Sequence, residues 1–229
     1  MTRRVRPIVV VAALGLATVL PAAQPTTRGA GAGEAAVRET FEAYRQALIA
    51  GDGEQAADLV DRETGDYYRE LKRLVLDGSE EEVRQRTFVD RFLVVAFRHQ
   101  FEEAELTGME LADVIVRAME IGWINSAAIE QLAVGAVRIE GDEAWAAART
   151  RATLGDPALG GGIDELEYRF VNEDGNWKFR FSALVASIDE VMRNLAEQLG
   201  ADEDDLIFTL VESLTGVEVL PEVWDAVER

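Results

Sequence analysis

The residues best suited to chemistry in this chain are one histidine and several pairs of carboxylates. The histidine is His99, and histidine is the usual general base near neutral pH. No serine or cysteine motif lies beside it to act as a nucleophile, so we interpret it as a polar position on a helix. Glu102-Glu103, and Glu165 with Glu167, stand among 43 acidic residues. Most of those acids must simply be solvated, so neither pair predicts an acid–base site.

Two acidic clusters contain the oxygen ligands that calcium prefers. The first, Asn172 to Asn176, is too short to surround a cation with six or more oxygens. The second, Asp202 to Asp205, has Ile207 and Ser213 where an EF-hand loop has its glycine and its last glutamate. We interpret it as the N-cap and first turn of a helix. Gly160-Gly161-Gly162 lacks the Lys-Ser/Thr of a phosphate loop, so no nucleotide site is expected there. Because neither acidic cluster fits calcium, we expect no metal and no other cofactor.

The first residues predict export. Arg3, Arg4 and Arg6 precede an apolar run from Ile8 to Leu20, and small residues follow. We expect a signal peptide over 1–23 and a flexible leader over 24–36; a retained membrane anchor is the alternative, but the run is short of about 20 apolar residues. The chain has no cysteine for a disulfide or a lipid anchor. These features indicate a periplasmic or extracellular protein.

The charge excludes two classes of partner. The formal net charge is -20, and removing residues 1–23 makes it -23 because three arginines and no acid are lost. Nucleic acid and anionic lipid are bound through clustered Lys and Arg. We therefore expect no nucleic-acid partner, and no membrane partner after signal cleavage.

Helical periodicity dominates the first half of the chain. The opening helix turns Arg45 away from its apolar face and ends at Gly51-Asp52-Gly53. Capping boxes at Ser79–Glu82 and Thr107–Glu110 predict two more helix starts, and the first opens one long helix through Phe97. The apolar face of the opening helix consists of Val37, Phe41, Tyr44 and Leu48.

Strand periodicity follows. We expect strands at 134–139, 143–154, 163–171 and 177–181, turns at Gly141-Asp142 and Asp174-Gly175, and a glycine-rich loop at 155–162. An even-numbered loop at the last turn pairs Phe170 with Phe179 and Tyr168 with Phe181 on one face. In the first hairpin, Arg138 lies opposite Trp145 on the other face. The acidic centre at 172–176 is therefore a hairpin turn and not a metal site.

The helical period returns near the C-terminus. Ser187–Glu190 forms a third capping box, and a last short helix is expected at Pro221. Between them lies an amphipathic helix whose stripe, by default, covers its own domain; a homodimer through it is the alternative. The stripe consists of Leu206, Ile207, Leu210, Val211 and Leu214.

This order of elements resembles the NTF2-like superfamily. The resemblance is carried by Gly141-Asp142-Glu143-Ala144, by Asp174-Gly175-Asn176-Trp177-Lys178, and by the opening helix with its Gly51-Asp52 stop. It implies an α+β fold in which N-terminal helices pack on a curved antiparallel sheet, the NTF2-like cone, over 37–184. A C-terminal helical extension then spans 185–229. The chain departs from the family in this extension and in the long helical stretch 79–124.

Similar domains include SnoaL-like and ketosteroid-isomerase-like enzymes, which place an Asp, Glu or Tyr deep in the cone. The face assigned inward here has no carboxylate, although Asp58 or Asp61 could enter from the helices, and Tyr67 and Tyr68 could add hydroxyls. The inward aromatic residues either fill the cone or line a pocket. The candidate ligand-binding residues are Tyr44, Tyr168, Phe170, Trp177, Phe179 and Phe181.

The sequence thus favours an exported, non-catalytic binding domain for a small apolar ligand or an envelope protein partner. One alternative is a SnoaL-like or isomerase-like enzyme acting on a small hydrophobic molecule. A purely structural envelope module is another.

Overall fold

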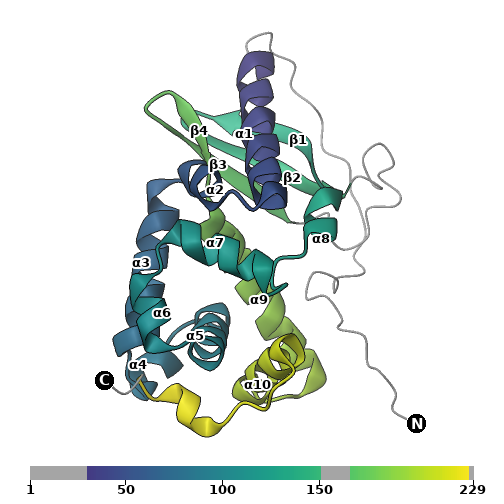
Figure 1. The fold of residues 1–229 in the computed structure, drawn as a ribbon. Helices are drawn as coiled ribbons and strands as arrows, with labels where there is room; N and C mark the ends of the chain where they lie inside the picture. The colour runs from purple at the N-terminus through teal and green to yellow at the C-terminus, as the bar shows by residue number, and fades with distance from the viewer. Residues whose placement is uncertain (1–29, 151–165, 227–229) are drawn as a thin grey trace, which may run out of the picture. The chain divides into compact units, whose positions relative to one another are not determined.

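The computed structural model describes residues 30–150 and 166–226, which form a mixed α+β protein (Figure 1). These residues divide into two compact units: a sheet unit (30–64, 110–150 and 166–184) and a helical unit (65–109 and 185–226). The predicted signal peptide and the glycine-rich loop at 155–162 lie outside the described residues. Within the described ranges, no helix is both long enough and apolar enough to cross a membrane.

The elements of the sheet unit are α1 (Ala30–Ala50), α2 (Gly53–Asp58), α7 (Leu111–Glu120), α8 (Ser126–Gln131), β1 (Leu132–Glu140), β2 (Glu143–Thr150), β3 (Glu167–Glu173) and β4 (Asn176–Phe179). Those of the helical unit are α4 (Glu80–Arg84), α5 (Phe88–Gln100), α6 (Glu103–Gly108), α10 (Glu203–Thr215) and the 3-10 helix η2 (Pro221–Trp224). Helices α3 (Arg62–Asp77) and α9 (Phe181–Leu199) each contain a unit boundary. Residues 30–36, assigned to the leader from sequence, form the first turns of α1.

The sheet is antiparallel with strand order β1-β2-β3-β4, as a meander requires. Two predicted pairs are confirmed: Arg138 pairs with Trp145, and Phe170 pairs with Phe179. Asp174 and Gly175 form the two-residue turn of the last hairpin with φ angles of 54° and 86°. Positive φ at both positions is the type I′ turn that matches strand twist. The acidic centre of this segment is therefore turn chemistry.

The predicted pairing of Tyr168 with Phe181 is wrong. The ladder ends at the pair Phe170–Phe179, and beyond it the Arg180 N–H donates to the Arg169 carbonyl over 2.8 Å. Phe181 is instead the first residue of α9, and its N–H donates to Thr64 Oγ1 over 3.0 Å. A side chain distant in sequence thus satisfies the first amide of the helix, which turns the chain out of the sheet.

Helix α1 packs across one face of the sheet (Figure 1). Val37 and Phe41 are buried, as the stripe predicts, and the β2 residues beneath are alanines that allow close approach. Arg45, expected to face solvent, is only 3% exposed. Its guanidinium is paired with Glu42 and also donates to the Glu130 carbonyl at 3.4 Å, so the buried charge is compensated.

One predicted helix start is confirmed and two are wrong. Ser79 caps α4, and its hydroxyl accepts from the Glu82 N–H over 3.2 Å. The long helix from Ser79 is interrupted at Thr87, whose side chain accepts from the Asp90 N–H over 3.2 Å and opens α5. The Thr107 hydroxyl bonds back to the Glu103 carbonyl, and the second capping box is instead Glu110 with Asp113, opening α7. Ser187 lies inside α9, which begins at Phe181. The S/T-x-x-E matches at Thr107 and Ser187 therefore lie inside helices and start none.

The core of the helical unit centres on α5. Phe88, Val94 and Val95 are buried on it, and α5 packs against α4, α10 and η2. The α10 stripe faces this core, with Ile207 and Val211 fully buried. The default reading of that stripe, that it covers its own domain, is confirmed.

Candidate binding site

The six aromatic candidates lie in or against one packed cluster of the sheet unit. Phe179 is central to it, with ring centroids 5.0 Å from Tyr44, 5.4 Å from Phe170 and 5.9 Å from Tyr168. Phe41 of α1 stacks on Tyr168 at 5.0 Å. Trp177 and Phe181 are partly buried at the margin of the cluster. These side chains are therefore positioned by one another, in the manner of a core.

Burial also suppresses acid–base chemistry at the two candidate tyrosines. It raises the pKa of Tyr168 to about 12 and also raises the pKa of Tyr44. A phenol acting as general base near neutral pH would need its pKa shifted the other way.

The other polar candidates are held by structural bonds or lie in the other unit. Asp61 is buried, and its carboxylate accepts from Thr64 and Arg180, whereas Asp58 is exposed. His99 belongs to the helical unit and Tyr168 to the sheet unit. Tyr67 and Tyr68 likewise lie in the helical unit, where their hydroxyls donate to the Asp90 carboxylate (2.8 Å) and the Met109 carbonyl (3.0 Å).

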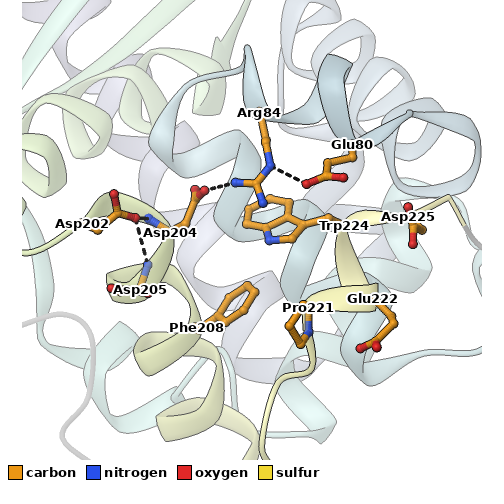
Figure 2. Close-up of a pocket in the computed structure, with 10 residues that line it drawn as sticks. All are labelled: Glu80, Arg84, Asp202, Asp204, Asp205, Phe208, Pro221, Glu222, Trp224 and Asp225. Atoms are coloured by element: carbon orange, nitrogen blue, oxygen red, sulfur yellow. Dashed lines mark hydrogen bonds and ion pairs between the residues drawn. The ribbon is translucent and has the colours of Figure 1, made fainter.

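The helical unit contains an open hollow of about 520 Å³ (Figure 2). Three elements wall it: α4, the N-terminal half of α10, and η2. Its walls carry six carboxylates and one arginine, with two aromatic side chains at its base. The lining residues are Glu80, Arg84, Asp202, Asp204, Asp205, Phe208, Pro221, Glu222, Trp224 and Asp225.

Arg84 lies over the aromatic base of this hollow. Its guanidinium carbon is 4.5 Å from the centroid of the Trp224 ring, within cation–π range. Nε donates to Glu80 over 2.7 Å, and a terminal nitrogen donates to Asp204 (Figure 2). Burial acts to lower the pKa of Arg84, but the hydrogen bonds and charges of Glu80 and Asp204 outweigh it and raise that pKa.

The Trp224 ring is fixed from several directions. It stacks on Phe208, with centroids 5.7 Å apart, and is only 3% exposed. The Arg98 guanidinium donates to the Trp224 carbonyl over 2.6 Å and to the Val223 carbonyl over 3.3 Å. The same guanidinium bonds three carbonyls at the C-terminal end of α3: Leu74, Val75 and Gly78. The base of the hollow is therefore tied to the end of a helix.

The α10 wall is ordered by its own cap and by a second arginine. Asp202 accepts from the N–H groups of Asp204 and Asp205, which fixes the first turn as the sequence predicts. Arg91, largely buried on α5, donates to Asp204 over 2.6 Å and pairs with Glu203. Asp204 therefore bridges Arg84 and Arg91.

The hollow remains strongly negative after these pairings. Asp205, Glu222 and Asp225 are exposed, and no hydrogen bond or ion pair joins these three carboxylates to another described side chain. Within the described residues, no group of three or more His, Cys, Asp or Glu side chains has the arrangement of a metal site. Unpaired surface carboxylates beside an aromatic base favour an organic cation.

Sequence reasoning singled out Asp202–Asp205 but missed Arg84, Phe208 and Trp224. Their association joins segments about 120 residues apart, and no local pattern encodes such a pairing. The acidic run at the start of α10 and the aromatic residue after Pro221 were the only local signals. Comparison of the chain with protein-family models, curated proteins and solved structures finds no match.

Proposed function

We propose that the protein is an exported, non-catalytic binding protein whose hollow in the helical unit receives a basic segment of a protein partner. The observation that carries this proposal is the lining of the hollow: six carboxylates, one arginine and a tryptophan base. Lysine and arginine side chains of a partner would meet Asp205, Glu222 and Asp225 at its rim.

Charge supports this class of partner beyond the hollow itself. A protein of net charge -20 attracts cationic segments over a Debye length and accelerates their encounter. A small apolar ligand has less support. The hollow is walled by charge, and the face of Trp224 is already covered by Arg84.

The same proposal assigns the sheet unit a supporting role and an NTF2-like arrangement. This assignment rests on the meander order, on α1 packed across the sheet, and on the glycine-containing turns at Gly141-Asp142 and Asp174-Gly175. Its aromatic face fills the interior, where Phe179 contacts both Tyr168 and Phe170. Export rests on the residues of the predicted signal peptide.

The proposal of a non-catalytic role is supported by the bonding of Asp61, the buried carboxylate among the acid–base candidates. Both oxygens of the Asp61 carboxylate are engaged, one by Thr64 and one by Arg180, at distances of 2.6 to 2.9 Å. A general base needs a lone pair directed at its substrate. Asp61 instead serves the packing of its own unit.

A titration with acetylated hexalysine tests the binding role. The protein, lacking residues 1–23, is followed by NMR, and binding should shift amide signals at the start of α10 and in η2. Neutralising the rim in D205N/E222Q/D225N should weaken binding by about tenfold, since each exposed charge pair contributes roughly 0.2–1 kcal/mol.

The matched control is E54Q/E190Q/E197Q, which removes three other exposed carboxylates and changes the net charge equally. If binding is specific to the hollow, this control keeps most of the affinity. Equal weakening by both triple variants, or no saturable binding by the parent protein, would overturn the proposal.

A further inference from the structure

The contacts of Arg84 match the chemistry of a guanidinium group. A planar guanidinium lies over the Trp224 ring while two carboxylates, Glu80 and Asp204, accept its N–H groups. An aromatic face combined with in-plane carboxylates matches a guanidinium better than a compact ammonium, because the fork of N–H donors lies in the plane that stacks.

We propose that Arg84 is a built-in occupant of a guanidinium subsite, and that an arginine side chain of the partner binds there by displacing it. This inference rests on the proposed function, since it names the residue type that the hollow recognises. Arg84 therefore competes with the partner's arginine, and the strength of the Arg84 contacts sets the affinity for the partner.

The geometry makes displacement feasible. The Arg84 side chain is 39% exposed and belongs to the last residue of α4, so it can swing into solvent. Its departure uncovers the face of the Trp224 ring, which is only 3% exposed while Arg84 lies over it. Glu80 and Asp204 are themselves partly exposed. Asp204 keeps its second pairing with Arg91 when Arg84 leaves. The groups that contact Arg84 therefore stay in place when its side chain leaves.

Competition predicts that removing Arg84 tightens binding. For acetylated hexaarginine we expect R84A to raise the affinity by about tenfold, because the partner's guanidinium no longer has to displace the cation–π and ion-pair contacts of Arg84. R69A is the matched control, since Arg69 is an exposed arginine of α3 that pairs only with Asp66 among the described residues, and its removal changes the net charge equally. Equal effects of R84A and R69A would sink the proposal.

A small-cation titration tests the subsite directly. In R84A, millimolar N-methylguanidinium should shift the Trp224 indole N–H signal saturably, whereas methylammonium should bind about tenfold more weakly. The signal is assigned with W224F, and urea unfolding checks that R84A is folded. No shift, or equal shifts with both cations, would show that no guanidinium subsite exists.

The two proposals fail separately. The carboxylate triple variants are measured with hexalysine on a chain that retains Arg84. If D205N/E222Q/D225N weakens hexalysine binding no more than its control variant does, the binding role itself is wrong. If that effect holds while R84A behaves like R69A, the hollow binds basic segments and only the competing role of Arg84 is wrong.

Discussion

Arg180 Nε donates to Asp61 Oδ2 over 2.6 Å, and the Asp61 side chain is completely buried. The other carboxylate oxygen accepts from the N–H and the hydroxyl of Thr64, in the first turn of α3. The Thr64 hydroxyl in turn accepts from the N–H of Phe181, the first residue of α9. One carboxylate therefore organises the start of one helix and, through Thr64, the start of another.

Replacing this carboxylate should destabilise the sheet unit. D61N leaves the partly buried Arg180 with only the more exposed Glu63 and Glu143, and we expect a loss of about 3 kcal/mol, as for other broken buried pairs. Urea unfolding followed by circular dichroism measures the change. D58N alters an exposed carboxylate at the end of α2 and should cost little; similar losses in both variants would contradict the role assigned to Asp61.

The hairpin registers could be predicted from sequence because their determinants are local. A two-residue loop containing glycine fixes the pairing of the strands on either side, and period-two alternation then assigns the faces. Arg138 opposite Trp145 and Phe170 opposite Phe179 both follow from this rule. The same rule failed at Phe181, since the helix start there depends on Thr64, which is 117 residues away.

The candidate site could not be predicted in the same way. The helical unit combines residues 65–109 with residues 185–226. No periodicity in the sequence indicates that these two segments pack together. From the sequence alone, Arg84 is interpreted as a charge on a helix surface and Trp224 as an isolated aromatic residue. Only their contact, with Asp204 and Glu80 alongside, makes a cation site of them.

The last hairpin offers a test of its turn. Gly175 has a φ of 86°, so G175A places a Cβ in the left-handed region and should cost roughly 1–2 kcal/mol. G31A is a useful counterpart, because Gly31 lies in α1 with open space around its Cβ position and should tolerate alanine. Thermal unfolding compares the two. Loss of stability confined to G31A would refute the assigned turn.

The acid sensitivity of the helical unit should depend in part on Glu70. Its hydrogen bond with Arg73, assisted by Arg86, lowers the pKa of this carboxyl from 4.5 to about 2. A lowered folded-state pKa stabilises the protein above pH 4.5, and this contribution disappears as pH falls toward 2.

The test is urea unfolding of the parent protein and E70Q between pH 6 and pH 2.5. E70Q should be less stable by about 1 kcal/mol or less at pH 6, because the side chain is partly exposed and solvent-screened, and the two curves should converge at low pH. E81Q changes an exposed carboxylate on α4 and should track the parent throughout. A gap for E70Q that is independent of pH would rule out an electrostatic origin.

The base of the hollow should depend on Arg98. This guanidinium donates to five backbone carbonyls, three at the end of α3 and two in η2, and burial lowers its pKa. R98M preserves the length of the side chain but removes every donor, so we expect a loss of about 3 kcal/mol or more, since hydrogen bonds from a charged group contribute roughly 1.5–3 kcal/mol each. Amide hydrogen exchange should become faster at residues 219–226, and hexalysine binding should weaken with it.

R69M, at an exposed arginine of the same helical unit, should change neither measurement. If R98M loses stability while exchange at 219–226 stays slow, the C-terminal segment is held by Phe208 and the core and not by Arg98.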